Sequence, residues 1–283
     1  MSLSDRIHDV HPCDPADYVP FLVEGLRVGM MKPEFAECLA GFADVFDVSR
    51  VAVSLSPLLN DHGSRSQAVA GVLETLREQG QIPGWRGELY PVNRTFDEPS
   101  LFDMERAAST LFGIRTYGVN LLGYVRDGEQ LSMWIARRAQ TKETNPGKLD
   151  IVVGGGQPVG ISLRVNLIKE CQEEAAIPES LASRAVEVDA TCFCTLRPEG
   201  IRDDIHYNYE LELPRDFIPK NTDGEVEGFY LWEIEKVMEV LGAGDEFAFD
   251  SALAILDFLA RHGNILSNDP VCALLKRHKI ESN

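Results

Sequence analysis

The chain has 283 residues, a formal net charge of −18 at pH 7 and 44% hydrophobic residues. Its length exceeds the ~100–150 residues of a typical domain, which predicts two domains, and its acidity argues against binding to nucleic acid or an anionic membrane. No apolar run approaches the ~20 residues that cross a bilayer, and the N-terminus lacks the apolar core of a secretory signal, so we expect a cytoplasmic protein.

Residues 1–115 are predicted to form a mixed α/β domain. Helices are expected at residues 33–42 and 64–79, where apolar residues recur at helical spacing. Alternating apolar residues predict a strand at residues 51–55. Residues 100–111 are predicted to form a third helix.

Residues 116–283 are predicted to form a second domain. It begins with a hairpin of two strands, residues 116–125 and 131–136, and then a polar loop. A strand at residues 149–153 leads into a run of glycines. Further strands are expected at residues 185–196, 205–213 and 229–232, and helices at residues 233–241, 249–262 and 270–278.

A glycine-rich loop, residues 154–156, precedes a predicted helix that carries Glu170, Glu173 and Glu174. The three glutamates stand at positions i, i+3 and i+4 and therefore share one face of the helix. Carboxylates crowded in this way repel one another unless a cation lies among them. Oxygen ligands suit a hard divalent ion, so we expect a Mg²⁺ or Mn²⁺ site.

The spacing of these residues resembles the box of the Nudix hydrolases: Gly, five residues, Glu, seven residues, Arg-Glu-hydrophobic-any-Glu-Glu-any-Gly-hydrophobic. Laid on Gly155, the spacing continues without a gap. The matching residues are Gly155, Glu170, Cys171, Glu173, Glu174 and Ile177. Three positions depart from the box: Ile161 replaces the first Glu, Lys169 the Arg, and Ala176 the last Gly.

The first part of the chain resembles the N-terminal domain of the thiamine-pyrophosphokinase-related Nudix proteins of fungi, plants and bacteria. The segments PFLVEGLRVG, GWRGELYPV and ERAASTLFGIRTYGVNLLGY carry this resemblance, which covers most of the chain. It implies an α/β fold in which a Nudix α/β/α sandwich follows a smaller mixed α/β N-terminal domain. The family analogy leaves a homodimer open.

The Nudix resemblance implies a metal site made by Glu170, Glu173, Glu174 and a backbone carbonyl near Gly154 or Gly155. Hydrolysis of a diphosphate requires neutralised charge and a water in line, which such a metal supplies. We expect Glu173 and Glu174 to be catalytic. Nudix enzymes commonly recruit a further acid from outside the box, and the candidates are Glu225, Asp223 and Glu227, of which we prefer Glu225.

Basic residues are concentrated just before the box. We expect Arg137, Lys142 and Lys148 to bind the phosphates, and the alternative is that they are ordinary surface residues. Two clusters have an unusual composition, residues 84–92 and residues 104–108 with 111–119, the second of which contains Arg106. For both we expect a helix face with an ion pair between the domains rather than a catalytic role. The aromatic residues that can stack on a ring are Trp85, Tyr90, Tyr117 and Tyr207, although core packing is the commoner role.

The resemblance therefore implies a divalent-metal-dependent hydrolase of a diphosphate linkage. Its expected substrate is a small molecule, thiamine diphosphate or an oxidised or damaged analogue, cut to the monophosphate and phosphate. One alternative is a substrate linked to a nucleoside diphosphate, such as a nucleotide, dNTP or nucleotide sugar. The other is a catalytically silent diphosphate-binding module, which Ile161 and Lys169 favour.

Overall fold

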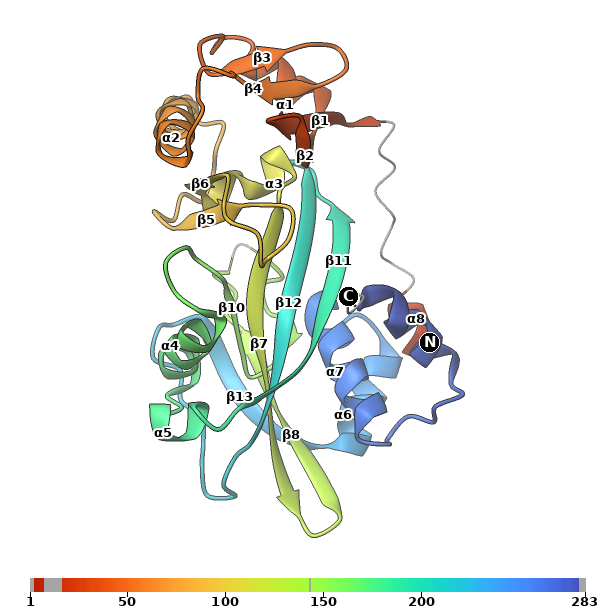
Figure 1. The fold of residues 1–283 in the computed structure, drawn as a ribbon. Helices are drawn as coiled ribbons and strands as arrows, with labels where there is room; N and C mark the ends of the chain where they lie inside the picture. Colours follow the sequence, from red (N-terminus) through yellow and green to blue (C-terminus); the bar gives the residue numbers. More distant parts are fainter. Residues whose placement is uncertain (1–2, 8–16, 143, 280–283) are drawn as a thin grey trace.

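The computed structural model describes residues 3–7, 17–142 and 144–279. The molecule is elongated, with a smaller α/β unit at one end and a large twisted sheet covered by helices at the other (Figure 1). This arrangement confirms the predicted fold class, a mixed α/β N-terminal domain followed by a sandwich. The division at residue 115 itself stays a prediction.

The N-terminal domain is built on a four-stranded sheet ordered β2-β1-β4-β3. Its strands are β1 (Val19–Val23), β2 (Leu26–Met31), β3 (Phe46–Val48) and β4 (Val53–Leu55). Two helices were predicted here and are confirmed, α1 (Pro33–Leu39) and α2 (His62–Glu78). Phe21, Phe46 and Phe112 meet in the core, with ring centroids 5.2–6.2 Å apart.

The helix predicted at residues 100–111 was wrong. The segment contains strand β6 (Phe102–Glu105), a 3-10 turn (Arg106–Ala108) and a single helical turn, α3 (Ser109–Phe112). Phe102 and Met104 alternate with polar neighbours and are buried, a period of two that suits a strand. β6 pairs with β5 (Leu89–Val92), so tertiary pairing overrides the weak helical pattern.

The second domain is organised around a sheet in the order β11-β12-β7-β8-β13. Only β12 and β7 of this series run parallel; the other neighbours are antiparallel. β9 (Leu149–Asp150) pairs with β8, and β10 (Val153–Gly156) pairs with β7. The main strands are β7 (Arg115–Asp127), β8 (Gln130–Arg138), β11 (Val186–Leu196), β12 (Ile201–Glu212) and β13 (Val226–Glu233).

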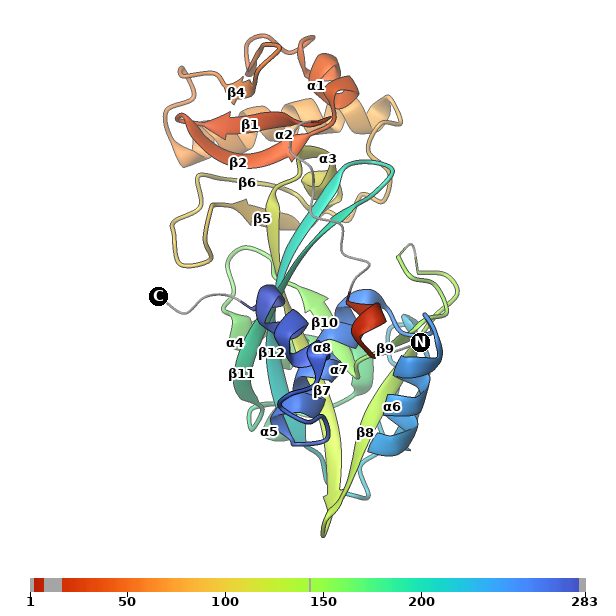
Figure 2. The same cartoon turned by 90° about the vertical axis from the view of Figure 1, so that its right-hand side faces the viewer.

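Helices cover both faces of this sheet, which makes the three layers of the sandwich (Figures 1 and 2). One face carries α4 (Leu163–Ala175) and α5 (Glu179–Ala182). The other face carries α6 (Ile234–Ala243), α7 (Phe249–Arg261), α8 (Pro270–Leu275) and a 3-10 turn (Lys276–His278). Each layer has its own apolar core, centred on Leu167 beneath α4 and on Phe258 beneath α7.

The start of the chain packs on the second domain and not on the first. A 3-10 turn (Leu3–Arg6) lies against α6 and α8, and Ile7 is buried in the core beneath these helices. Figure 2 shows this turn beside α6. Within the described ranges, no helix combines the length and apolar character that a membrane span requires.

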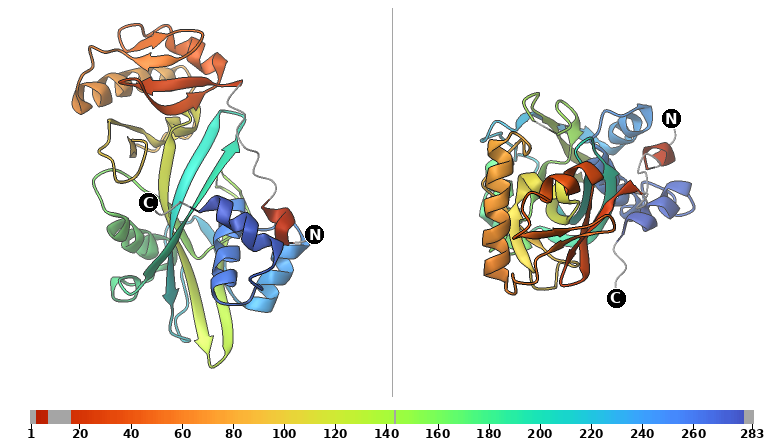
Figure 3. Two further views of the ribbon diagram at one scale, coloured as in Figure 1. Left: turned by 45° about the vertical axis from the view of Figure 1, so that its right-hand side comes forward. Right: turned by 90° about the horizontal axis from the view of Figure 1, so that it is seen from above.

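The two domains meet where the β11–β12 hairpin reaches the N-terminal domain (Figure 3). The Lys32 ammonium donates to the carbonyl of Pro198 at 2.6 Å, near the hairpin turn. A Cβ added to Gly200 would lie 2.1 Å from the carbonyl oxygen of Thr110 in α3. The hairpin therefore touches backbone directly, and this contact closes one end of the cleft described below.

Candidate active site

The glycines at residues 154–156 form part of strand β10, where the sequence predicted a loop. Their backbone pairs with residues 118–120 of β7. A Cβ on Gly155 would lie 2.4 Å from Cδ of Glu170, and one on Gly156 would lie 1.6 Å from the Tyr90 hydroxyl. The missing side chains therefore let a glutamate and a tyrosine approach the strand directly.

Helix α4 is fixed on this strand by its own polar residues. The Ser162 hydroxyl caps the helix by accepting from the Val165 N–H at 3.3 Å. The Asn166 amide donates to the Gly156 carbonyl at 2.9 Å, and the Gly154 N–H donates to Oε2 of Glu174 at 2.9 Å. Burial raises the pKa of Glu174 to about 8, although the Gly154 hydrogen bond opposes this shift.

The acidic loop before β13 also supports a cation site. Carboxylate oxygens of Glu174, Asp223 and Glu225 all lie within 4.8 Å of one another. The Thr222 hydroxyl donates to the Glu173 carbonyl and so ties the loop to α4. The preferred residue of the predicted loop, Glu225, is thus brought to the box, 51 positions from Glu174 by sequence number.

The donor set fits a hard divalent ion. The gathered atoms are carboxylate oxygens beside the backbone of residues 154–155, and no nitrogen or sulfur ligand is among them. Glu174 is buried, Glu225 is half-buried and Asp223 is exposed, and carboxyl groups this close to one another favour a cation or a shared proton between them. Glu174 with its loop partners would hold such an ion.

The other two box glutamates contact Lys169. Its ammonium lies 3.1 Å from Oε1 of Glu170 and 2.9 Å from Oε2 of Glu173. Burial raises the pKa of Glu170, while Lys169 opposes this rise. Ile161 stands where the box has a glutamate, and the contacts of Lys169 are with these two glutamates of its own helix. Their roles as ligands stay predictions.

Only one of the three predicted phosphate-binding residues lies at the cleft. Lys142 lines it and contacts Glu225; although burial opposes ionisation, Lys142 holds the pKa of Glu225 below its usual range. Arg137 instead donates to the Gly147 carbonyl at 2.7 Å. Lys148 pairs with Asp245 at 3.1 Å. A phosphate-binding role for these residues remains a prediction.

A cleft of about 600 Å³ lies between the two domains. The N-terminal domain contributes Arg86, Tyr90 and Arg106, and the large sheet contributes Asn120 and residues 154–156. The three box glutamates do not line it themselves. Two of them contact residues that do: Glu170 lies against Gly155, and Glu174 accepts from the Gly154 N–H.

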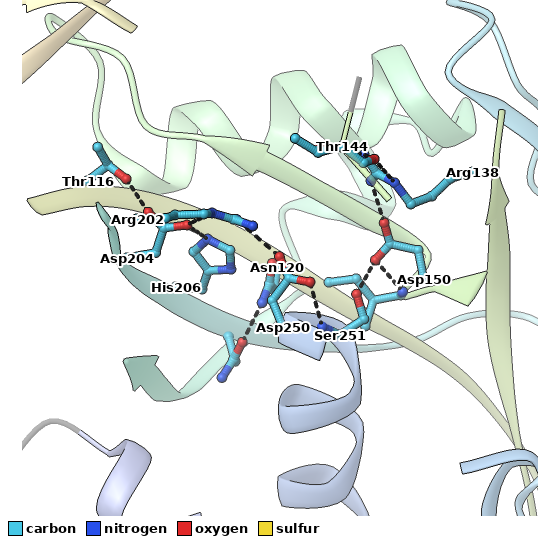
Figure 4. A network of polar contacts seen from close by, with 12 residues as sticks. Thr116, Asn120, Arg138, Thr144, Asp150, Arg202, Asp204, His206, Asp250 and Ser251 are labelled. Carbon is cyan, nitrogen blue, oxygen red and sulfur yellow. Dashed lines mark hydrogen bonds and ion pairs between the residues drawn. The ribbon is translucent and has the colours of Figure 1, made fainter. Parts of the chain in front are cut away.

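The opposite wall of the cleft is a buried network of charges, which Figure 4 shows. Arg202 donates from Nε to Asp204 at 2.5 Å and from its terminal nitrogen to Asp250 at 3.1 Å. The Thr116 hydroxyl also donates to Asp204, and His206 Nε2 lies 3.7 Å from the same carboxylate. This network joins β7, β12 and the first turn of α7.

A second part of the network surrounds Asp150 (Figure 4). Arg138 donates to it at 2.7 Å, the Ile151 N–H donates at 2.8 Å, and the Ser251 hydroxyl donates to the same carboxylate. Neither part was predicted from the sequence. One signal was available in the sequence. Arg202, Asp204 and His206 are polar and two residues apart, and this spacing along a strand places them on one face.

Arg106 does not form the predicted ion pair between domains. Its partner is Glu88 of the same domain, at 2.9 Å. The guanidinium is also packed over the Tyr90 ring, 5.5 Å from the centroid. Arg106 thus faces the cleft from the N-terminal side.

Comparison with known proteins identifies relatives of both parts. Residues 4–116 match a family described as "Domain of unknown function (DUF4743)". The chain is 43% identical over 259 residues to Nudix hydrolase 20, chloroplastic, of Arabidopsis thaliana, which covers 88% of this chain and 69% of that protein. It is 41% identical over 257 residues to Nudix hydrolase 24, chloroplastic, of the same plant, which covers 90% and 70%.

A solved structure of a MutT/nudix family protein from Enterococcus faecalis aligns with a TM-score of 0.44 and 13% identity, over 74% of this chain and 75% of that one. The relatives' names place them in the chloroplast, and a cytoplasmic location for this chain stays a prediction. Because this chain covers 69% of a relative to which it is 43% identical, and carries the box on α4, it belongs to the Nudix hydrolases and hydrolyses diphosphate linkages.

Proposed function

We propose that this Nudix hydrolase is a Mg²⁺- or Mn²⁺-dependent diphosphatase that cleaves thiamine diphosphate, or an oxidised or damaged analogue, to the monophosphate and phosphate. One observation carries the metal dependence: carboxylate oxygens of Glu174, Asp223 and Glu225 converge to within 4.8 Å of one another. Glu170, Glu173 and a carbonyl of Gly154 or Gly155 complete the proposed ligand set.

Each residue of the proposed site has its own role in the hydrolysis. A bound divalent ion supplies charge neutralisation and a more acidic water. Glu225, kept ionised by Lys142, accepts the proton of the attacking water. Lys142 also faces the phosphate oxygens from the cleft. Glu173 and Glu174 act with the metal, Glu174 being held by the Gly154 N–H.

The cleft supports the choice of a small heteroaromatic diphosphate. Its volume of about 600 Å³ lies within the roughly 300–1,000 Å³ of pockets that enclose small molecules. Tyr90 and Tyr117 line its wall, although they are only 5% and 2% exposed, and Asp203, which pairs with Arg115 at 3.2 Å, adds a carboxylate to the lining that would attract a cationic ring. The relation to thiamine rests on the N-terminal domain, which resembles that of the thiamine-related Nudix proteins.

The test is a phosphate-release screen with Mg²⁺ and with Mn²⁺. The substrates are thiamine diphosphate, oxidised thiamine diphosphates, nucleotide sugars, ADP-ribose, coenzymes and dNTPs. We expect the largest kcat/KM for a thiamine diphosphate, and loss of about 100-fold or more in Glu174→Gln because a metal ligand is removed. Glu179→Gln, an exposed acid in α5, is the control that should keep full activity.

The outcomes separate the alternatives. Full turnover by Glu174→Gln would show that the box is not the active site. If a nucleotide sugar or a dNTP is the best substrate, the protein acts on nucleoside diphosphate-linked substrates and not on thiamine diphosphate. Binding of diphosphates without any turnover would instead identify a silent binding module.

A further inference from the structure

Arg106 is held at the cleft by a rigid turn of the N-terminal domain. The residue before it, Glu105, is only 3% exposed, and its carboxylate accepts from the backbone N–H groups of Arg86 at 2.9 Å, Gly87 at 3.0 Å and Ala107 at 3.3 Å. These bonds join the segment before β5 to the 3-10 turn that begins at Arg106. The backbone of Arg106 is therefore fixed although its side chain is 45% exposed.

The same segment is docked on the glycine strand. The Val159 N–H donates to the Leu89 carbonyl at 3.0 Å, immediately after β10. Tyr90 is 5% exposed and its hydroxyl occupies the space that a side chain at residue 156 would need. A Cβ added to Gly156 would also lie 3.6 Å from the guanidinium carbon of Arg106, so Tyr90 and Arg106 both lie beside Gly156.

Arg106 is also close enough for its charge to act on one carboxylate of the box and on one of the acidic loop. Its positive charge interacts with Glu170 and with Glu225. It lines the cleft together with Lys142. A diphosphate that occupied this cleft beside Glu170 and Glu225 would thus have Lys142 on the side of the Nudix sheet and Arg106 on the side of the N-terminal domain.

We propose that Arg106 binds a phosphate oxygen of the substrate, so that the N-terminal domain supplies a specificity-determining residue to the Nudix site. Glu88 accepts a hydrogen bond from one guanidinium nitrogen of Arg106 at 2.9 Å and so orients the guanidinium. The remaining N–H donors of the guanidinium can then bind phosphate. This inference rests on the proposed function, since it assigns the diphosphate to this cleft.

The experiment compares wild type, Arg106→Gln, Arg106→Lys and Arg94→Gln. Arg94 is the matched control: it lies in the same domain, is 49% exposed and pairs with Glu98 at 2.8 Å, away from the cleft lining. Calorimetry measures binding of methylene diphosphonate with Mg²⁺ present. Phosphate release from the best substrate of the screen gives KM and kcat.

Loss of a charge-assisted hydrogen bond should weaken binding of methylene diphosphonate by Arg106→Gln about 10- to 100-fold and raise KM by a similar factor. Arg106→Lys should recover part of the affinity, because it keeps the charge but not the planar fork. Arg94→Gln should match wild type in both measurements. Thermal unfolding of each variant identifies any that fails to fold, and the lysine variant then decides.

Binding of methylene diphosphonate by Arg106→Gln with wild-type affinity would overturn the inference. A lower kcat with unchanged binding would overturn it as well, because the role would then lie elsewhere than in phosphate binding. If wild type binds the probe but releases phosphate from no substrate, the proposed function fails while the binding arm still tests Arg106.

Discussion

At the scale of single residues, the departures from the box have visible consequences. Lys169 contacts Glu170 and Glu173, and Ala176 ends α4 in the left-handed region, with a φ of 52° and a ψ of 30°. The box has glycine at this position. A side chain there is strained by about 1–2 kcal/mol, since only glycine adopts this conformation freely.

Ala176→Gly should therefore stabilise the protein. We expect the free energy of unfolding to rise by about 1 kcal/mol, the strain relieved minus the extra freedom of glycine in the unfolded chain. Urea unfolding followed by circular dichroism measures it. Ala175→Gly, one residue earlier and buried within the helix, should instead lower the free energy of unfolding by about 1 kcal/mol or more. A loss of stability in both variants would contradict the argument.

At the scale of elements, the charge network fastens α7 to β12. The helix has no side-chain cap, and Asp250 in its first turn binds Arg202 of the strand. Although burial opposes ionisation, the Arg202 guanidinium holds the pKa values of Asp204 and Asp250 below their usual range. A carboxyl whose pKa is lowered by folding stabilises the folded state above its unfolded pKa, and this contribution is lost as the pH falls through its folded pKa.

Asp250→Asn should thus destabilise the protein in a pH-dependent way. At pH 7 we expect the free energy of unfolding to fall by about 1.5–3 kcal/mol, the range for a hydrogen bond to a charged group. The difference from wild type should shrink below the ordinary pKa of 3.8, where the wild-type carboxyl begins to take up a proton when unfolded. Urea unfolding at a series of pH values measures both.

The control for this prediction is Asp127→Asn. Asp127 pairs with Arg215 at 2.7 Å, but the two side chains are 50% and 68% exposed. An exposed pair of this kind contributes only about 0.2–1 kcal/mol. An equal loss in both variants, or a loss in Asp250→Asn that does not change with pH, would count against a special role of the network.

At the scale of the whole molecule, the cleft exists because the two domains are held together by close backbone contact. The hairpin turn at Gly200 touches α3. The Thr110 carbonyl oxygen of α3 fills the space that a side chain on Gly200 would need. Gly113 at the end of α3 has a φ of 57°, and a Cβ added to it would lie 1.9 Å from the Met30 carbonyl oxygen. Gly113 lies just before β7, where the chain enters the second domain, and Gly200 lies in the β11–β12 hairpin turn that meets α3.

Gly200→Ala should lower the free energy of unfolding by about 1–3 kcal/mol, because backbone at 2.1 Å must move to make room for the methyl group. It should also raise KM, since the wall that carries Arg106 shifts with the N-terminal domain. Gly71→Ala is the control: it lies in the middle of α2 with open space around it, and should be neutral or stabilising. Unfolding in urea and phosphate-release kinetics measure these effects.

Much of the fold follows from local pattern. The amphipathic spacing of α7, the spacing of the box on α4 and the strand-like runs of β7, β11 and β12 are properties of short segments, and the structure confirms these elements. The prediction failed where a segment's partner lies elsewhere. Within residues 100–111, Phe102–Glu105 form a strand because β5 pairs with them, and residues 154–156 form a strand because β7 pairs with them.

The residues of the candidate site also fall into those that a local pattern predicts and those that it does not. Glu170, Glu173 and Glu174 were found from spacing, because a helix places positions i, i+3 and i+4 on one face. Glu225 was preferred among several acids, and the structure adds Asp223 beside it. The network around Arg202 and Asp150 was not predicted, because its members come from strands and a helix whose relative position no short pattern specifies.

The sequence by itself determined the family, the box on its helix and the acid loop, since each is a feature of residues close together along the chain. The tertiary structure alone decided that Arg106 and Tyr90 face the glycine strand and that Lys142, not Lys148, lines the cleft. The physical reason is that these neighbours are set by how two domains pack. Packing depends on contacts between segments far apart in the chain, and periodicity records only which face of each segment is buried.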